Sequence, residues 1–376
     1  MNKFLIVCIV SITIAKANAQ NALAIGDSLY SLGNYNAAIT QYKQTTGAED
    51  KIARAYKAVG NNAMAIQYYK KHLENEKTDV LSSYNYGKLL LSANRFKQAD
   101  SLFEVLSKAN PKNPEFYYQL GLAKEKQKDS IAFIKYLQAL TNDKNHQNAL
   151  FKVAKIQAER RNFNEAMMNI ERGLKVDSES VRFLNLKALI AYVNKSYHLA
   201  ADTYEKLIDL NQSNERLHEN LAVSYNQTNR FEQAISQYAI LINEYDDKNP
   251  SWHFSIAKNY EALRYLDKAQ HHFEIAIALQ DLPLDKSYVA LASVYKKQKD
   301  YKNQFSVLQK AVRENSNNQR ALYLLATAAD NYFVDDAVVL PYYEKYLAIF
   351  GEQGNYTEHA KQRIKDLKTD IHFNKN

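Results

Sequence analysis

The sequence predicts an all-α protein built from one repeated helical hairpin. Glycine and proline are scarce, at 9 and 5 of 376 residues, which suits a chain that is nearly all helix. Over Leu221–Leu241, apolar residues recur every three or four positions on both sides of the polar stretch Asn226–Arg230. This spacing indicates two amphipathic helices joined by a short turn. The same pattern returns through most of the chain at a period of about 34 residues.

A small residue opens the second helix of each hairpin and aligns the repeats. These residues are Ala38, Ala65, Ala99, Ala132, Ala166, Ala200, Ala234 and Ala269. Four positions after each comes a large side chain, namely Tyr42, Tyr69, Phe103, Tyr136, Ile170, Tyr204, Tyr238 and Phe273. In most units a second small residue, such as Gly26 or Ala222, lies twelve positions before the aligned alanine. We expect the small residues to let the helices approach closely and the large one to fill the wedge between them.

Three units depart from this spacing. The first two aligned alanines are only 27 residues apart, so the helices around Gly47 and Gly60 are expected to be short. The fourth unit has lost one residue, because Gly121 precedes its aligned alanine by eleven positions. A ninth unit carries Gln304 in place of the small residue.

Prolines are expected to mark the starts of several helices. Pro114 and Pro250 each follow an asparagine and suit a first helical position, where a missing N–H costs nothing. A tenth unit begins at Arg320, and Pro341 is expected to start its second helix for the same reason. One more helix is predicted over Thr357–Lys368, with a single apolar stripe suited to closing the end of the stack.

The first nineteen residues have the pattern of a secretory signal peptide. Lys3 supplies the positive start, Phe4–Ala15 the apolar core, and Ala17–Ala19 a cleavage site of small residues. An apolar core of about 12 residues is too short to span a bilayer, so a retained anchor is the less favoured alternative. We expect an exported protein, periplasmic or beyond, with no transmembrane segment after cleavage. The chain then divides into the signal peptide (1–19), the repeat array (20–350), and a capping helix with a tail (351–376).

The chain resembles the tetratricopeptide-repeat proteins from about Asn21 to Phe350. The matching residues of the unit described first are Leu221, Ala222, Tyr225, Phe231, Ala234 and Tyr238, and the period is typical of that family. The resemblance implies a right-handed superhelical solenoid of about ten hairpins with a C-terminal capping helix. It also implies a scaffold that binds a protein or peptide on its concave face, which the first helix of each hairpin lines.

No pattern of residues indicates catalysis or metal binding. None of the nine histidines has His-Glu-x-x-His spacing, and adjacent His271 and His272 would point about 100° apart on a helix. Phosphate-binding glycine loops are missing, and Cys8, the only cysteine, lies in the signal segment. We therefore expect no enzymatic activity, no cofactor and no bound metal.

The charge of the chain gives a weak indication of its partners. The formal net charge of +8 falls to +6 when residues 1–19 are removed, because Lys3 and Lys16 leave with them. Such a small excess on an exported protein mildly favours acidic partners or envelope surfaces, and nucleic acid is not expected. The oligomeric state and the identity of the partner do not follow from the sequence.

The resemblance places two positions of each first helix in the groove, three before and one after its small residue. Carried onto this chain, the candidate peptide-binding groove is Tyr84, Lys88, Tyr118, Phe151, Lys155, Asn185, Phe254 and Lys258. A ring beside a lysine suits an extended peptide, since the ring offers apolar area and the ammonium a partner for an acidic side chain. The alternative is that the rings pack partly on neighbouring helices while the lysines are solvated.

The interpretation that we prefer is a non-enzymatic protein-interaction scaffold that assists assembly of an envelope or secretion complex. The alternative is a helical solenoid that binds carbohydrate or another small ligand for uptake at the outer membrane, since groove rings can stack on sugars.

Overall fold

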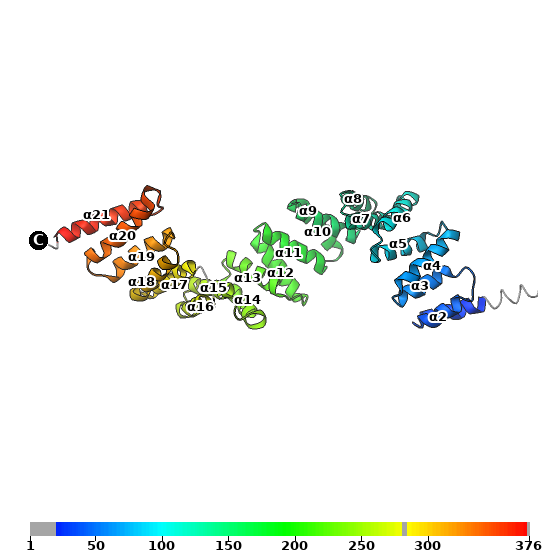
Figure 1. Ribbon diagram of the computed structural model, residues 1–376, viewed down its shortest axis with the longest axis horizontal. Coiled ribbons are helices and arrows are strands. Elements are labelled where there is room, and N and C mark those ends of the chain that lie inside the picture. The colour runs from blue at the N-terminus through cyan, green and yellow to red at the C-terminus, as the bar shows by residue number, and fades with distance from the viewer. Residues whose placement is uncertain (1–19, 280–283, 374–376) are drawn as a thin grey trace, which may run out of the picture. The chain divides into compact units, whose positions relative to one another are not determined.

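The computed structural model describes residues 20–279 and 284–373, and every regular element within those ranges is helical (Figure 1). The chain divides into two compact units, unit 1 (Met1–Phe183) and unit 2 (Leu184–Asn376). Within each unit, helices pack mainly on their neighbours in sequence. The fold is an all-α repeat solenoid, which confirms the predicted class.

Unit 1 begins with helical residues 20–31, which form a hairpin with α2 (Tyr35–Tyr42). Four hairpins follow: α3 (Glu49–Ala58) with α4 (Asn62–Asn75), α5 (Val80–Ser92) with α6 (Phe96–Ala109), α7 (Pro114–Lys126) with α8 (Ile131–Asn142), and α9 (Gln147–Glu159) with α10 (Phe163–Val176). Helix α11 (Val181–Val193) begins in unit 1 and continues into unit 2.

Unit 2 continues the series with α12 (Tyr197–Asp209), the second helix of the sixth hairpin. The next hairpin is α13 (Glu215–Gln227) with α14 (Phe231–Ile240), which passes into the short π-helix η1 (Leu241–Tyr245). Then come α15 (Pro250–Ala262) with α16 (Leu266–Leu279), α17 (Asp285–Gln298) with α18 (Tyr301–Glu314), and α19 (Gln319–Tyr332) with α20 (Asp336–Phe350). A 3-10 turn, η2 (Gly351–Gln353), leads to α21 (Thr357–Phe373). The described residues thus form ten hairpins and one further helix, as predicted.

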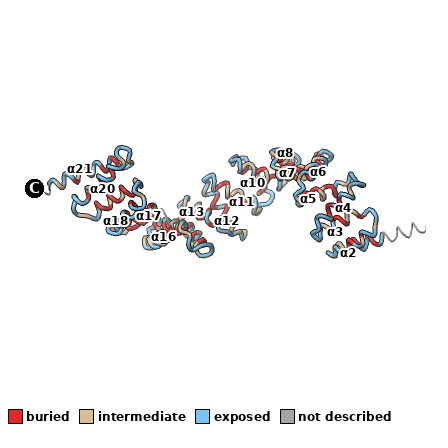
Figure 2. The backbone as a smooth tube through the Cα atoms, in the orientation of Figure 1, coloured by how far each residue is buried: buried red, intermediate tan, exposed pale blue. Residues whose placement is uncertain are grey.

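The residues that define the repeat also hold each hairpin together. The eight aligned alanines are 0% to 5% exposed, and the eight large side chains are 0% to 4% exposed. A Cβ atom added at Gly121 would lie 2.5 Å from Cε1 of Tyr136, so no side chain fits there without moving the ring. The expected wedge is confirmed. Figure 2 shows the buried residues running along the helices, with the turns exposed.

One residue in each of the first nine hairpin turns has a left-handed backbone. It is Gly33 or Gly60 in the first two, and Asn94, Lys128, Arg161, Lys195, Asn229, Arg264 or Lys299 in the others. This residue lies five positions before the aligned residue, except that Lys128 lies four before. The residue lost from the fourth unit is therefore missing from the turn after Lys128. The register of Gly121 in α7 is unaffected.

The irregular units follow the sequence analysis closely. Helices α2 and α3 are short, with 8 and 10 residues. In the ninth hairpin Gln304 is 2% exposed, and its Oε1 has no hydrogen-bond partner among the described residues. Helix α21 starts at Thr357 as predicted, but it continues to Phe373.

Prolines mark two of the three expected helix starts. Pro114 and Pro250 are first helical residues, each preceded by an asparagine whose side chain caps the helix. The prediction for Pro341 is wrong, because α20 begins five residues earlier at Asp336. There the Asp335 carboxylate accepts a hydrogen bond from the N–H of Ala337. The capping carboxylate therefore sets the start of α20, and Pro341 lies inside the helix without an N–H for the ladder.

The signal peptide expected at residues 1–19 lies outside the described residues. From residue 20 to 279 and from 284 to 373, no helix is both long and apolar enough to cross a membrane.

Candidate functional site

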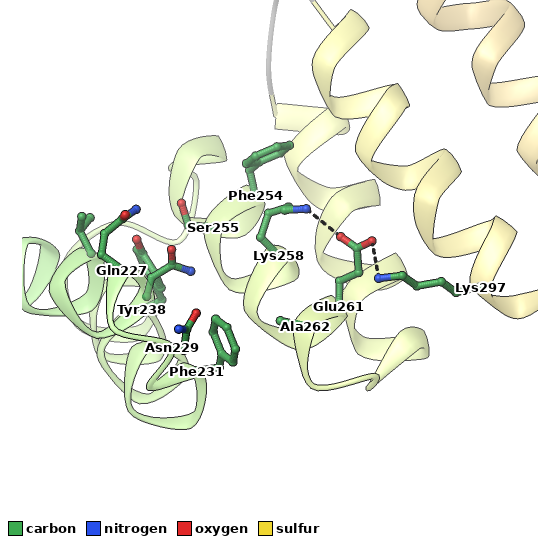
Figure 3. Close-up of a pocket in the computed structure, with 12 residues that line it drawn as sticks. Gln227, Asn229, Phe231, Tyr238, Phe254, Ser255, Lys258, Glu261, Ala262 and Lys297 are labelled. Atoms are coloured by element: carbon green, nitrogen blue, oxygen red, sulfur yellow. Dashed lines mark hydrogen bonds and ion pairs between the residues drawn. The ribbon is translucent and has the colours of Figure 1, made fainter. Parts of the chain in front are cut away.

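Unit 2 has a groove centred on α15, in which two cavities share Phe254 and Lys258 (Figure 3). The first cavity has a volume of about 600 Å³ and extends from α15 toward α13. Three side-chain amides line it, and we call it the amide pocket: Asn226, Gln227 and Asn229. The second cavity extends toward α17 and α19 and is described below as the cationic pocket. The two together are the α15 groove.

The helical repeat places the central side chains on one face of α15. Phe254, Lys258 and Glu261 have the spacing i, i+4 and i+7, so they lie in line. Phe254 is half-buried, and its ring meets that of Phe273 in α16 edge to face, with centroids 5.3 Å apart. Since Phe273 is the aligned large residue of this hairpin, the hairpin core positions the ring in the groove.

Glu261 is a buried carboxylate in the wall of the groove, with its side chain 4% exposed. Its Oε2 accepts a hydrogen bond from Lys258 Nζ at 2.9 Å, and its Oε1 accepts one from Lys297 Nζ at 3.0 Å (Figure 3). The same Oε1 accepts from Ser293 Oγ at 2.7 Å. Burial alone would raise the pKa of Glu261, but these three hydrogen bonds outweigh it and hold the pKa below its ordinary value. The carboxylate is therefore charged at neutral pH. We call these four residues the Glu261 cluster.

Hydrogen-bonded amides form part of the wall between α13 and α15. Asn226 Nδ2 donates to Asn259 Oδ1 at 2.8 Å, and Asn259 Nδ2 donates to the carbonyl of Ser255 at 2.8 Å. Asn259 is fully buried. Figure 3 shows Gln227 and Asn229 on the opposite side of the pocket from Lys258. Because amides both donate and accept hydrogen bonds, this side of the groove suits an uncharged backbone or side chain.

The cationic pocket, of about 410 Å³, has two positive side chains at its margin besides the shared Lys258. Lys286 of α17 and Arg320 of α19 are exposed, and neither makes an ion pair with any residue that the structure describes. Asp285 is adjacent in sequence but buried, and its Oδ2 accepts from the amides of Asn315 and Asn318 at 3.1 and 2.7 Å. This side of the groove therefore suits an anionic group.

In unit 1, the predicted residue Tyr84 belongs to a polar cluster around Glu115. Tyr84 Oη and Gln119 Nε2 donate to Glu115 Oε1 at 2.8 and 2.7 Å, and His146 Nε2 lies 3.0 Å from Glu115 Oε2. His146 Nδ1 accepts from the N–H of Ala149, so its Nε2 carries the proton that is donated to Glu115. Burial alone would raise the pKa of Glu115, but the bonds from His146, Gln119 and Tyr84 hold the pKa below its ordinary value. We call Glu115, Tyr84, Gln119 and His146 the Glu115 cluster.

Two further predicted residues lie against this cluster. Lys88 Nζ is 5.2 Å from the centroid of the Tyr84 ring, which is the cation–ring pairing expected. The ring of Tyr118 packs between Tyr136 and His146, with centroids 5.9 and 5.3 Å away. These rings therefore pack in part on neighbouring helices, as the alternative interpretation has it.

The remaining predicted residues are at other places on the first helices. The ring of Phe151 meets that of Phe183 edge to face, and the cation over it is Arg182, at 5.4 Å. Lys155 is exposed, with its Nζ 3.9 Å from a carboxylate oxygen of Glu159. Asn185 is exposed on α11. Of the eight residues predicted for the groove, Phe254 and Lys258 line the two cavities and the other six do not.

The polar residues of the α15 groove that the sequence analysis missed include Asn226, Glu261, Lys286, Lys297 and Arg320. It considered two positions of each first helix, whereas these residues lie at helix ends or one turn further along. The spacing contains a usable signal. Ser293 and Lys297 follow Glu261 by 32 and 36 residues, close to one repeat period, which brings them beside it on the next first helix.

Two histidines of the α15–α16 hairpin form a hydrogen-bonded pair. The Nδ1 atoms of His253 and His272 are 3.0 Å apart, and His253 Nε2 lies 3.0 Å from the carbonyl oxygen of Asp247. Tyr260 stacks on His272, with centroids 5.7 Å apart. Burial, with smaller effects of His253 and His271, lowers the pKa of His272 to about 4. No group of three or more His, Cys, Asp or Glu residues within the described ranges could hold a metal ion.

Models of the tetratricopeptide repeat match residues 50–81, 84–149, 151–215 and 285–318, a little over half of the chain. The chain therefore belongs to the tetratricopeptide-repeat proteins. Members of this family are generally non-catalytic scaffolds for protein interaction, and this chain has the same fold. No curated protein is significantly similar to it in sequence.

Several solved structures are also similar to this chain. YrrB, described as a tetratricopeptide-repeat protein with an unusual peptide-binding site, is 16% identical with a TM-score of 0.44 over 50% of this chain and 96% of YrrB. Yeast Tom70 is 13% identical with a TM-score of 0.40 over 95% of this chain and 97% of Tom70. The C-terminal part of a tetratricopeptide-repeat protein from Cytophaga hutchinsonii is 14% identical with a TM-score of 0.47, over 64% and 99% of the two chains. The family assignment rests on the repeat models and the helical hairpins.

Proposed function

We propose that this protein is a non-enzymatic scaffold that holds an extended segment of a partner protein in the α15 groove. The observation that carries the proposal is the groove itself: a half-buried ring, Phe254, between an amide pocket and a cationic pocket. An apolar anchor with hydrogen-bonding groups on either side is the usual composition of a peptide-binding surface.

The dimensions of the groove favour a chain over a compact ligand. Its lining comes mainly from the first helices of four successive hairpins, α13, α15, α17 and α19, with Phe231 and Tyr238 of α14 beside them. Packed helices lie about 8–10 Å apart, and an extended peptide rises about 3.3 Å per residue. About three residues of a bound segment therefore correspond to each hairpin. A segment of roughly nine residues would contact all four helices.

We further propose that the protein is exported and acts in the periplasm, where it assists assembly of an envelope or secretion complex. The support is the pattern of Lys3, Phe4–Ala15 and Ala17–Ala19 in the sequence.

Site-specific photo-crosslinking in the native cells tests the scaffold function. The full chain would carry a photoreactive residue at Gln227 in the groove or, as the matched control, at exposed Lys302 on α18. We expect defined protein adducts from position 227 but not from 302, and at least a fivefold loss of these adducts with Phe254→Ala. A thermal melt would confirm that this variant folds. The same products from both positions, or products indifferent to Phe254→Ala, would refute the proposal.

A further inference from the structure

The positive side chains around the α15 groove are not equivalent. Four of them border it: Lys258, Lys286, Lys297 and Arg320. Lys258 and Lys297 are bound to Glu261, whereas Lys286 and Arg320 have no carboxylate partner within residues 20–279 and 284–373. Among the described residues that line the groove, the cations that make no ion pair therefore lie only at the cationic pocket.

On the other side, the Glu261 cluster holds both lysines on one carboxylate. Lys258 and Lys297 are 49% and 37% exposed at their side chains, and both reach inward to the same buried carboxylate. An acidic ligand on this side would compete with Glu261 for these two ammonium groups, and a buried carboxylate that loses its partners is strongly destabilised. Beyond these lysines toward α13, the described lining of the amide pocket has no charged side chain, and it combines amides such as Asn226 and Gln227 with apolar Val223 and Phe231.

The cationic side has room for an acidic side chain. Lys286 and Arg320 are exposed at the margin of the 410 Å³ cavity, whose lining includes the apolar Val289 and Ala290. The one buried acid at its edge, Asp285, is held by two asparagine amides and by the first turn of α17. Arginine and lysine at such a position bind carboxylates through charge-assisted hydrogen bonds.

We propose that the partner segment has an asymmetric composition: an apolar residue at Phe254, an acidic residue on the α17–α19 side, and uncharged residues on the α13 side. Glu261 is the residue that determines this specificity, because its carboxylate holds the ammonium groups of the two lysines nearest the anchor. This inference rests on the proposed function and names the class of partner that the groove accepts.

Binding to a defined peptide library tests the inference. The probes are fluorescein-labelled nine-residue peptides with a central Leu or Phe and flanks of Ser, Thr, Asn and Gln. Asp or Glu is placed on the N-terminal side, the C-terminal side, both sides or neither. For the full chain we expect one of the one-sided sets to bind about three- to tenfold tighter than the other and than the neutral set. The set that is acidic on both sides should bind no better than the preferred set, and added salt should reduce the difference.

Two variants assign the preference to named residues. Lys286→Gln with Arg320→Gln should abolish it, whereas Lys302→Gln with Arg313→Gln, the same charge change on exposed positions of α18, should leave it intact. Glu261→Gln should release Lys258 and Lys297, so that the set that is acidic on both sides becomes the tightest binder. Thermal melts would confirm that each variant is folded.

Each outcome either supports or overturns the inference. Equal binding of all four sets, or a preference that survives Lys286→Gln with Arg320→Gln, overturns it. If no peptide set binds although position 227 crosslinks to a protein in cells, the charge asymmetry is wrong and the scaffold function remains. If neither assay gives a groove-dependent product, the proposed function fails as well.

Discussion

The Glu115 cluster of unit 1 and the Glu261 cluster of unit 2 are each built around a glutamate on a first helix, but the two carboxylates differ in the residues that bind them. Glu115 is bonded by Tyr84, Gln119 and His146, which come from three successive first helices or their caps. Glu261 is bonded by a serine and by two lysines whose chains also border the amide pocket.

The difference shows how a repeat protein separates stability from binding. Both carboxylates lie on a first helix, where the repeat brings side chains of the next hairpin within reach. The Tyr84 hydroxyl, the Gln119 amide and the His146 imidazole all bond to the Glu115 carboxylate inside the stack of helices. These bonds connect neighbouring hairpins and involve no lysine or arginine. Two of the three partners of Glu261 are lysines with partly exposed side chains, so the same kind of bond determines which cations of a groove are free to bind a ligand.

The largest expected effect comes from the ring beside each cluster. Phe103 packs next to Tyr84, with centroids 6.3 Å apart, and Phe273 packs next to Phe254 at 5.3 Å, and both are fully buried. Phe103→Ala and Phe273→Ala should each destabilise their own unit by about 3–5 kcal/mol. Hydrogen exchange read peptide by peptide would measure this, because repeat arrays can unfold locally.

The same two variants should differ in their effect on partner binding at the α15 groove. Phe273→Ala should also weaken capture at the α15 groove, because it removes the support of Phe254, whereas Phe103→Ala should not. If both variants weaken capture equally under conditions where unit 2 remains folded, the groove does not lie where we place it.

Lowering the pH should destabilise the α15–α16 hairpin, which contains the His253–His272 pair, before it destabilises the Glu115 cluster. The folded pKa of His272 is about 4, below the ordinary value of about 6.5, so the unfolded chain binds the proton first as the pH falls. The contribution of the His253–His272 pair is therefore complete above about pH 6.5 and is lost as the pH falls toward 4. After allowance for solvent screening of a half-exposed ring, the loss is on the order of 1–2 kcal/mol.

The Glu115 cluster should resist the same change. The pKa of Glu115 is lowered, so its contribution persists until the pH falls below the ordinary range of a glutamate. Hydrogen exchange between pH 6.5 and 4.5 should show α15 and α16 losing protection before α7 and α9. His272→Gln should remove the difference, and the control His271→Gln, at an exposed neighbour, should not. Equal losses in both regions would count against the histidine pair as the cause.

The smallest effects come from single hydroxyl groups. Tyr84→Phe removes one hydrogen bond to Glu115, and Ser293→Ala removes one to Glu261, each worth about 1 kcal/mol of local stability. Only Ser293→Ala should alter binding at the α15 groove, by less than about threefold, because Lys258 and Lys297 still hold the carboxylate. A change in groove binding with Tyr84→Phe would mean that the two clusters are not independent.

The position of each hairpin could be predicted from the sequence, because packing residues recur at a fixed interval. The aligned alanines and large side chains are all buried, and the residue lost from the fourth unit is missing between Lys128 and Ala132, where it shortens the start of α8 and leaves the register of α7 unchanged. The prediction for Pro341 was wrong because this segment has two possible helix starts, the proline and the capping carboxylate of Asp335. The helix begins at the cap, which comes first in the chain. Local sequence cannot rank two such signals.

The candidate site was predicted only in part. Phe254 and Lys258 were identified through their place in the repeat, and both line the α15 groove. Glu261 was not, because its character depends on Ser293 and Lys297, more than thirty residues away.

The sequence by itself determined the all-α class, the ten hairpins and the residues of their cores, since burial of apolar side chains follows a period that can be read along the chain. Only the tertiary structure decided which of the predicted groove positions border a cavity and which cations there are already bound to a carboxylate. Those properties depend on side chains that adjacent helices bring within about 3 Å of one another, and hydrogen bonds and ion pairs form only at that distance.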